Sequence, residues 1–295
     1  MTFKTVAILS PGDMGHAVGL VLGSHGLRVI TCLQGRSQRT RGLASRAHIE
    51  DVSTFQALVS EADVILSILV PAQAMQAAKV IAGALLDMKA KSLYVECNAI
   101  APQTTCEIGD MIHGAGGRFV DVGIIGAPPG KGGETCFYAS GPEVSSFEEL
   151  SRFGLKIIPL GEQIGQASAI KMCYAALTKG LVALCTELFT AAEILGVSQA
   201  LKERIRSGSP SILLKHVEQE LPKMPEKSGR WIGEMEEIAK TFEFVGLTPE
   251  IFAGAADIYR LVYETDLAMR TPEDLTPRPS LSQVVTTLAG YLQKK

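Results

Sequence analysis

The apolar pattern of the sequence changes near residue 161, and this change constrains the fold more than any other feature. Before it, short apolar runs of strand length, such as TVAIL, VITCL and ADVILSILV, alternate with stretches of helical periodicity. From about residue 167 the periodicity is helical only. Alternating strands and helices predict a mostly parallel sheet covered on both faces. We therefore predict an α/β domain over residues 1–162 and an all-α domain over residues 163–295.

The second half contains the most apolar long stretch of the chain. A single helix is predicted from about Ala167 to Leu195, and residues 270–279 are expected to form a surface linker before a last short helix. Charged residues lie inside the long helix, among them Lys171, Lys179 and Glu187. Charges inside a span argue against a bilayer helix, so we expect a buried helix of a soluble protein.

The composition is that of an ordinary globular protein. The chain is 46% hydrophobic and 20% charged, with a formal net charge of −3, which gives no reason to expect nucleic acid or an anionic membrane as partner. The N-terminus lacks the apolar core of a secretory signal. The six cysteines form no CxxC pair. We therefore expect no metal site, reduced thiols and a cytoplasmic protein.

A glycine-rich turn, SPGDMG, follows the first predicted strand. Gly12 and Gly15 match two glycines of the dinucleotide fingerprint, one for the approach of the pyrophosphate and one for close helix packing. Ser10 stands in place of the first glycine, and the following proline still permits a tight turn. We therefore predict a Rossmann-type dinucleotide site, with a plain strand–helix turn as the alternative. The predicted cofactor contacts of the turn are Pro11, Gly12, Asp13, Met14 and Gly15.

The segment after the second predicted strand indicates which dinucleotide is bound. Sites that prefer NAD place a carboxylate here for the ribose hydroxyls, but CLQGRSQRTR contains no acid. Arg36 and Ser37 instead suit a 2′-phosphate, which needs charge-assisted donors. We predict NADP, with NAD still possible; a solvated basic helix start is the alternative. Asn98, which follows the strand SLYVEC, is predicted to pair with the nicotinamide carboxamide, unless it is an ordinary turn asparagine.

Several segments, in this order along the chain, resemble the 3-hydroxyacid dehydrogenase and 6-phosphogluconate dehydrogenase superfamily. They are SPGDMG, GRS, ILVP, ECNAIAPQT, DVGIIGAPPGKGG and GQASAIKMCYAALTKG. KMCYAALTKG and RWIGEMEEIAKTF are similar to a less characterised branch, the phosphogluconate-dehydrogenase-like NAD-binding proteins with their own helical C-terminal domain. The resemblance implies a Rossmann-type fold, a nicotinamide cofactor and further cofactor contacts from Leu69, Val70 and Pro71.

Lys171 lies in a predicted helix that is apolar on almost every face. Oxidation of an alcohol needs a base for the hydroxyl proton while the nicotinamide accepts the hydride. Burial would favour the neutral amine that such a base requires. The resemblance places the catalytic lysine of the superfamily at this position, so Lys171 is predicted to be the general acid/base. A surface lysine that snorkels from a helix start is the alternative.

The substrate does not carry over from the superfamily. Ile125 stands where the family has a substrate-contacting serine, and Ala175 stands where it has an asparagine. Tyr174 and Thr178 share a helical face with Lys171 and are predicted to hold the substrate oxygen instead.

Two further segments are predicted to contact the substrate. The glycine-rich loop after the strand RFVDVGII offers backbone N–H groups for a carboxylate, with Gly123 and Gly126 as the candidates and a flexible loop as the alternative. Arg230, Trp231 and Glu234 fall on one helical face, with the arginine suited to a carboxylate and the tryptophan to an apolar wall. Plain helix packing is the competing interpretation.

Together these features predict an NAD(P)-dependent dehydrogenase or reductase that acts on CH–OH groups. The predicted reaction transfers a hydride between the cofactor and the alcohol carbon of a small 3-hydroxy acid or a related hydroxy compound. A homodimer is expected, because one face of the long apolar helix needs a cover. Two alternatives stay open: an NADPH-dependent imine or ketone reductase, and a non-catalytic dinucleotide sensor.

Overall fold

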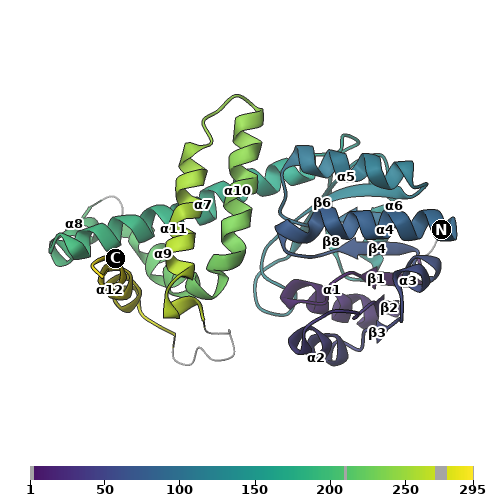
Figure 1. The fold of residues 1–295 in the computed structure, drawn as a ribbon, viewed down its shortest axis with the longest axis horizontal. Helices are drawn as coiled ribbons and strands as arrows, with labels where there is room; N and C mark the ends of the chain where they lie inside the picture. Colours follow the sequence, from purple (N-terminus) through teal and green to yellow (C-terminus); the bar gives the residue numbers. More distant parts are fainter. Residues whose placement is uncertain (1–2, 209–210, 270–277, 295) are drawn as a thin grey trace. The chain divides into compact units, whose positions relative to one another are not determined.

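The computed structural model describes residues 3–208, 211–269 and 278–294, so residues 270–277 of the expected linker lie outside the described residues. The chain forms two compact units, Met1–Met172 and Cys173–Lys295 (Figure 1). Their boundary falls inside helix α7 (Gln166–Ile194), whereas the sequence pattern places a domain boundary before this helix. The difference arises because the first turn of α7 is hydrogen-bonded to the sheet.

The first unit is built on one eight-stranded sheet with the order β3-β2-β1-β4-β5-β6-β7-β8. Neighbouring strands are parallel except β6 and β7, which are antiparallel. The order from β3 to β6 is that of doubly wound dinucleotide-binding folds, and the predicted fold class is confirmed. The strands are β1 (Thr5–Ile8), β2 (Arg28–Thr31), β3 (Glu50–Asp51), β4 (Val64–Ser67), β5 (Leu93–Glu96), β6 (Arg118–Ile125), β7 (Cys136–Ser140) and β8 (Lys156–Gly161).

Helices cover both faces of this sheet. One apolar core joins alternate strand residues such as Val6 and Ile8 to α1, α2 and α6, and a second core joins Ala7 and Ile65 to α3, α4 and α5. Both faces of each central strand are therefore buried, which explains the continuous apolar runs in the sequence. The helices of this layer are α1 (Asp13–Ser24), α2 (Gln38–Arg46), α3 (Phe55–Glu61), η1 (Pro71–Gln73), α4 (Ala74–Met88), α5 (Pro102–Gly114), α6 (Val144–Glu148) and η2 (Glu149–Phe153).

The second unit is helical throughout its described residues. α10 and α11 pack side by side (Figure 1), and a side chain of each contacts Lys179 of α7. The hydroxyl of Tyr259 donates to the carbonyl oxygen of Lys179 at 2.6 Å, and Phe252 lies against Gly180. The helices after α7 are α8 (Ser198–Arg206), α9 (Ser211–Glu220), η3 (Leu221–Lys223), η4 (Pro225–Lys227), α10 (Ser228–Phe244), α11 (Glu250–Tyr263), η5 (Asp266–Ala268) and α12 (Leu281–Leu292).

α7 is the one helix in the described part of the chain that is long and apolar enough to cross a membrane. The fold accounts for this composition in another way. Its first turn is held by polar groups of the sheet, and Lys179 in its middle forms an ion pair with the buried Glu234. These contacts belong to a helix that packs within a globular unit.

Candidate active site

The glycine turn between β1 and α1 has one open position and one tightly packed position. A Cβ atom on Gly12, the N-cap of α1, would meet nothing within 4 Å. A Cβ atom on Gly15 would lie 2.5 Å from the carbonyl oxygen of Ser10. Ser10 also accepts a hydrogen bond of 2.7 Å from the N–H of Gly12, which closes the turn. The open position lets a pyrophosphate approach the backbone, and the packed position requires glycine.

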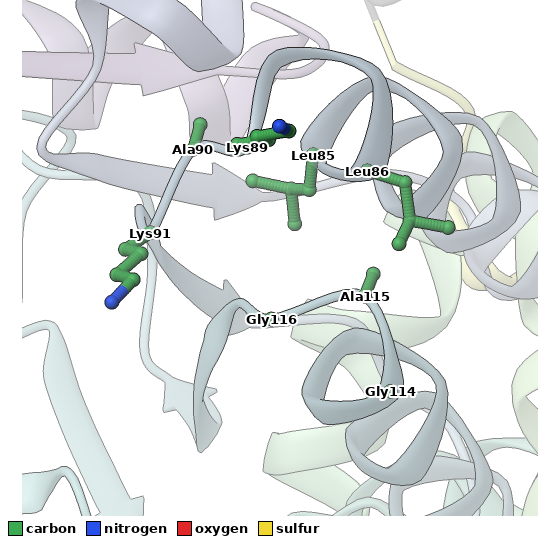
Figure 2. Close-up of a pocket in the computed structure, with 8 residues that line it drawn as sticks. All are labelled: Leu85, Leu86, Lys89, Ala90, Lys91, Gly114, Ala115 and Gly116. Atoms are coloured by element: carbon green, nitrogen blue, oxygen red, sulfur yellow. The ribbon is translucent and has the colours of Figure 1, made fainter.

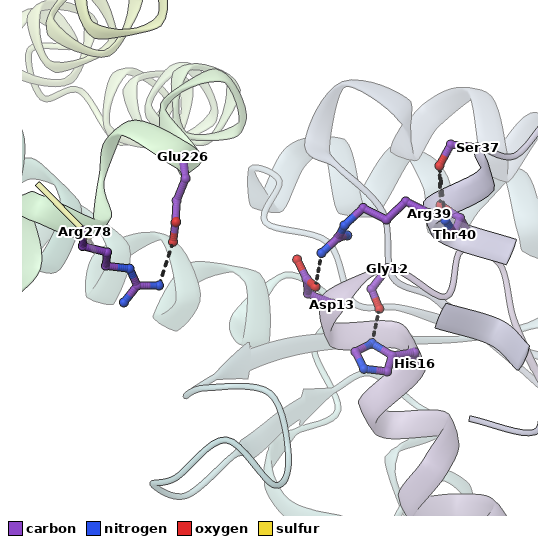
Figure 3. Close-up of polar contacts among 8 residues, drawn as sticks. All are labelled: Gly12, Asp13, His16, Ser37, Arg39, Thr40, Glu226 and Arg278. Carbon is purple, nitrogen blue, oxygen red and sulfur yellow. Dashed lines mark hydrogen bonds and ion pairs between the residues drawn. The ribbon is translucent and has the colours of Figure 1, made fainter. Parts of the chain in front are cut away.

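A charged pair spans this turn and the start of α2. Arg39 Nη2 lies 2.7 Å from Asp13 Oδ1 (Figure 3). Burial alone would raise the pKa of Asp13, but the hydrogen bond and the charge of Arg39 hold the pKa of this carboxyl below its usual range. In the same place Ser37 is the N-cap of α2, and its hydroxyl accepts from the N–H of Thr40 at 3.2 Å. Basic and capping groups therefore meet at the carboxyl end of β2.

A hollow of about 410 Å³ lies at the carboxyl edge of the sheet. The guanidinium of the half-buried Arg36 forms part of its wall and donates to the carbonyl oxygen of Leu9 at 3.1 Å. Burial lowers the pKa of Arg36. The carboxyl edge of a doubly wound sheet is where dinucleotides bind, so this hollow suits the adenosine end. Its lining residues include Leu9, Arg36, Phe55, Leu69, Gln73 and Val80.

A second hollow, of about 320 Å³, lies at the opposite edge (Figure 2). It is lined by the ends of α4 and α5, with Lys89 and Lys91 beside Leu86 and Gly116. These residues directly precede β5 and β6, so the hollow is at the amino edge of the sheet. The cofactor does not bind at that edge in this fold class. None of the predicted site residues lines it.

Asn98 ties the carboxyl ends of two strands together. Its Oδ1 accepts from the N–H of Leu69 at 2.5 Å, and its Nδ2 donates to Ser67 Oγ at 2.9 Å. Its own N–H donates to Glu96 Oε1 at 2.8 Å. The side-chain amide thus fixes the turn after β4, where Val70 and Pro71 follow. The structure therefore gives Asn98 a positioning contact, in addition to the cofactor contact predicted from its place in the sequence.

Asp121, near the middle of β6, holds the start of α7. Its carboxylate accepts from the N–H of Gly165 at 2.9 Å and from the N–H of Ser168 at 3.0 Å. It also accepts from the hydroxyl of Ser168 at 2.6 Å and from that of Ser140 at 3.0 Å. The first N–H groups of a helix have no partner within the helix, and here a buried carboxylate supplies one. Burial raises the pKa of Asp121, against these hydrogen bonds.

This anchorage sets the position of Lys171. Its ammonium group donates to the carbonyl oxygen of Ile124 at 2.5 Å, and the side chain is half-buried. A Cβ atom on Gly123 would lie 2.4 Å from the carbonyl oxygen of Ala167 and 3.1 Å from Lys171 Cβ. Gly123 therefore permits the close packing of β6 against α7. Gly126 has a φ of +128°, and a Cβ there would lie 2.2 Å from the carbonyl oxygen of Glu134.

The five remaining predicted substrate residues lie in the helical unit. The hydroxyl of Thr178 donates to the carbonyl oxygen of Tyr174 at 3.0 Å. Arg230 Nε lies 3.2 Å from Glu234 Oε1, and Glu234 also pairs with Lys179. Two of these residues lie on α7, and α10 brings together the other three, Arg230, Trp231 and Glu234.

Sequence reasoning missed three polar residues near these groups. Asp121 and Lys179 are charged residues inside apolar segments, and that contrast is the signal that marks them. Lys227 reads as part of the surface run PEKSGR and carries no such signal. No group of three or more metal-ligating His, Cys, Asp or Glu side chains occurs among the described residues.

The strand order and the glycine turn define a class, the dinucleotide-binding proteins of the Rossmann type. The family is more specific. Residues 5–153 match the model described as the NAD binding domain of 6-phosphogluconate dehydrogenase, and the chain belongs to this family. Residues 192–262 match a domain of unknown function, DUF1932.

Three similar proteins extend this comparison. An uncharacterised 28.5 kDa protein of Methanothermus fervidus is 31% identical over 177 residues, which are 60% of this chain and 66% of that protein. A conserved protein of unknown function with structural similarity to 3-hydroxyacid dehydrogenases is 28% identical, with a TM-score of 0.65 over 88% of this chain and 97% of that one. Mycobacterium tuberculosis 3-hydroxyisobutyrate dehydrogenase has the same fold, at 21% identity and a TM-score of 0.68 over 97% of this chain and 99% of that one.

Proposed function

We propose that this chain transfers a hydride between NADP(H) and the alcohol carbon of a small 3-hydroxy acid or a related hydroxy compound, with Lys171 as the general acid/base. The observation that carries the proposal is the placement of Lys171. Its ammonium group is fixed by the carbonyl of Ile124, on the sheet whose first turn forms the predicted dinucleotide seat. A likeness to a dehydrogenase of 3-hydroxyisobutyrate supports a substrate of this class.

The residues present fit a dinucleotide. Gly12 leaves its side of the turn open, and Arg36 and Leu69 line a hollow at the carboxyl edge of the sheet. When bound, the nicotinamide supplies the hydride acceptor in oxidation and the donor in reduction. Lys171 Nζ takes the hydroxyl proton as the alcohol carbon loses its hydride, and it returns a proton to the oxygen in the reverse direction. The carbonyl of Ile124 orients the amine for both steps.

NADP is proposed over NAD because of the groups at the carboxyl end of β2. Arg36, Ser37 and Arg39 meet there, and two guanidinium groups suit a 2′-phosphate. Besides Asp13, which pairs with Arg39, the structure brings Asp51 of β3 to this end. One oxygen of Asp51 accepts from the N–H of Leu33 at 2.8 Å, and the other lies 4.0 Å from Arg41. This carboxylate is therefore already engaged by the protein.

A homodimer and a cytoplasmic location are part of the proposal. Leu177 and Leu184, on α7, are 68% and 59% exposed, and an apolar helix face of this kind favours a second copy of the chain as its cover. All six cysteines are free thiols, which suits a reducing compartment.

Nicotinamide absorbance tests the reaction directly. The protein is offered 3-hydroxy acids, hydroxy amino acids and cyclic imines with each cofactor, and Lys171→Ala and the surface variant Lys91→Ala are run beside it. We expect turnover of hydroxy acids with NADP, its loss in Lys171→Ala and its retention in Lys91→Ala. Retained turnover in Lys171→Ala would remove the proposed base. Turnover of imines alone would identify an imine reductase, and cofactor binding without any turnover would identify a dinucleotide sensor.

A further inference from the structure

Two buried polar atoms near the start of α10 lack a hydrogen-bond partner among the described residues. One is the indole Nε1 of Trp231, a side chain that is only 8% exposed. The other is Oε2 of Glu226, whose second oxygen, Oε1, lies 3.3 Å from Arg278 Nη2 (Figure 3). Buried polar groups in folded proteins nearly always have partners, so exceptions that cluster within a few residues point to a binding site.

Lys227 lies over the same indole ring. Its ammonium group is 5.9 Å from the centroid of the Trp231 ring, and the structure shows no ion pair for it within the described residues. Burial lowers the pKa of Lys227; Glu226 and Glu220 oppose this shift, whereas Arg230 and Arg278 add to it. A partly desolvated cation without a counter-ion attracts an anion.

The neighbouring charges are already paired. Lys223 lies 2.7 Å from Glu220, Arg278 pairs with Glu226, and Lys179 pairs with Glu234. Arg230, which the sequence suggested as the carboxylate ligand, also lies beside Glu234. Lys227 is therefore the cation of this cluster whose charge the described side chains leave least compensated.

We propose that Lys227 Nζ and Trp231 Nε1 bind the carboxylate of a small organic acid, of the class named in the proposed function. A carboxylate has two acceptor oxygens, which match one ammonium donor and one indole donor, and such charge-assisted bonds are strong. The indole is held in place because it packs edge-on against Tyr259 at 5.3 Å. One half-buried lysine balances one negative charge. The nearby Glu226 and Glu234 disfavour a dianion such as phosphate.

This inference rests on the proposed function for the identity of the acid, but its test needs no turnover. Trp231 is the only tryptophan of the chain, so its fluorescence reports on the site. The full chain, without cofactor, is titrated with 3-hydroxypropionate, 3-hydroxybutyrate, 3-hydroxyisobutyrate and L-serine. Butane-1,3-diol is the neutral counterpart of 3-hydroxybutyrate, and sodium chloride at the same ionic strength controls for unspecific anions.

We expect a saturable change in fluorescence with at least one of the acids and none with the diol. Lys227→Met should lower the affinity for that acid by about tenfold or more, because the charge-assisted bond is lost. The matched control Lys223→Met, at a half-buried lysine paired with Glu220, should retain the affinity. Calorimetry on Trp231→Phe should also show weaker binding of the acid, since an aromatic ring is kept but the indole N–H donor is removed. Thermal unfolding confirms that the variants are folded.

Each other outcome decides against the inference. It is overturned if no acid gives a saturable signal, if the signal survives Lys227→Met, or if chloride reproduces it as an adventitious ion only. Failure of the proposed reaction is seen separately. Acid binding that needs Lys227, together with turnover that survives Lys171→Ala, rejects the catalytic lysine and leaves the carboxylate site standing.

Discussion

In the nucleotide-binding unit, the distance to the neighbouring backbone determines which positions require glycine. Gly15 and Gly123 have no room for a side chain, whereas Gly12 faces open space. The sequence predicted the roles of Gly12 and Gly15, because both glycines belong to the dinucleotide fingerprint. It predicted Gly123 for a different reason, as a carboxylate cradle. The packing against Ala167 depends on a helix that is distant in sequence, and no local pattern reports such an approach.

Arg36 offers a test of cofactor choice at the residue scale. Arg36→Gln removes a cation from the wall of the hollow at the carboxyl end of β2. We expect the preference for NADP over NAD to fall about tenfold, because one charge-assisted bond to the 2′-phosphate is lost. Dissociation constants of both cofactors, measured by calorimetry at fixed salt, check this. Arg46→Gln, in the last turn of α2, is the control. An unchanged ratio in Arg36→Gln would assign the phosphate elsewhere.

Glu96 gives a pH dependence with a definite sign. The side chain is fully buried, and burial raises its pKa to about 8, partly opposed by hydrogen bonds from Asn98. The folded state therefore holds a proton that the unfolded chain releases near pH 4.5. The contribution of this group to the free energy of unfolding is fully present below pH 4.5 and is lost as the pH rises to about 8. The loss is on the order of a few kcal/mol.

Glu96→Gln removes this titration and keeps an acceptor for the N–H of Asn98. We expect the urea midpoint of the native protein to fall between about pH 5 and pH 8 relative to that of the variant. Equilibrium unfolding at several pH values measures the difference. Parallel profiles for the two proteins would show that Glu96 is not protonated in the fold.

At the scale of elements, strands and long helices were predictable and their anchors were not. Buried parallel strands such as β1 and β4 read as continuous apolar runs, and the long apolar stretch predicted α7 to within a residue at each end. α8 was not predicted, because none of its residues is buried and its short sequence is mostly polar. The network of Asp121 was missed because it joins β6 and β7 to α5 and α7, which lie far apart in the sequence.

That network gives a prediction about α7. Asp121→Asn keeps the size of the side chain but places an NH₂ group among N–H and O–H donors. We expect a loss of about 2–4 kcal/mol in stability, because buried donors are left unpaired. Ser168→Ala is the milder variant; it removes one bond to Asp121 and one to Thr105 and should cost about 1–2 kcal/mol.

The same variants test whether Asp121 positions Lys171. Where Ser168→Ala is fully folded, kcat should fall while the KM for the cofactor stays unchanged, since α7 shifts and the dinucleotide turn does not. A purely structural role would lower the melting temperature and leave kcat at the native value. Denaturation curves and steady-state kinetics at one temperature separate these results.

At the scale of the whole molecule, the two units differ in how closely their fold and family define what they bind. The first has a sheet order and a glycine turn that together define its ligand class, and residues 5–153 place it in a known family. The second matches a domain without an assigned function. Its polar cluster of Glu226, Lys227 and Trp231 is seen in the structure, and no sequence pattern predicted it. The sequence could therefore specify the cofactor class more closely than the substrate, because the glycine turn is a local pattern, whereas the residues predicted to contact the substrate lie on separate elements.

The exposed apolar face of α7 gives a prediction about the oligomeric state. Leu177 and Leu184 lie seven residues apart and so share one side of the helix. Leu177→Glu with Leu184→Glu should convert a dimer into a monomer near the chain mass of 31.5 kDa, because two charges per chain would have to be buried in the interface. Light scattering at several concentrations measures the mass, and Leu20→Glu, on an exposed position of α1, is the control. A native protein that is monomeric at every concentration, or a double variant that stays dimeric, would exclude α7 as the interface.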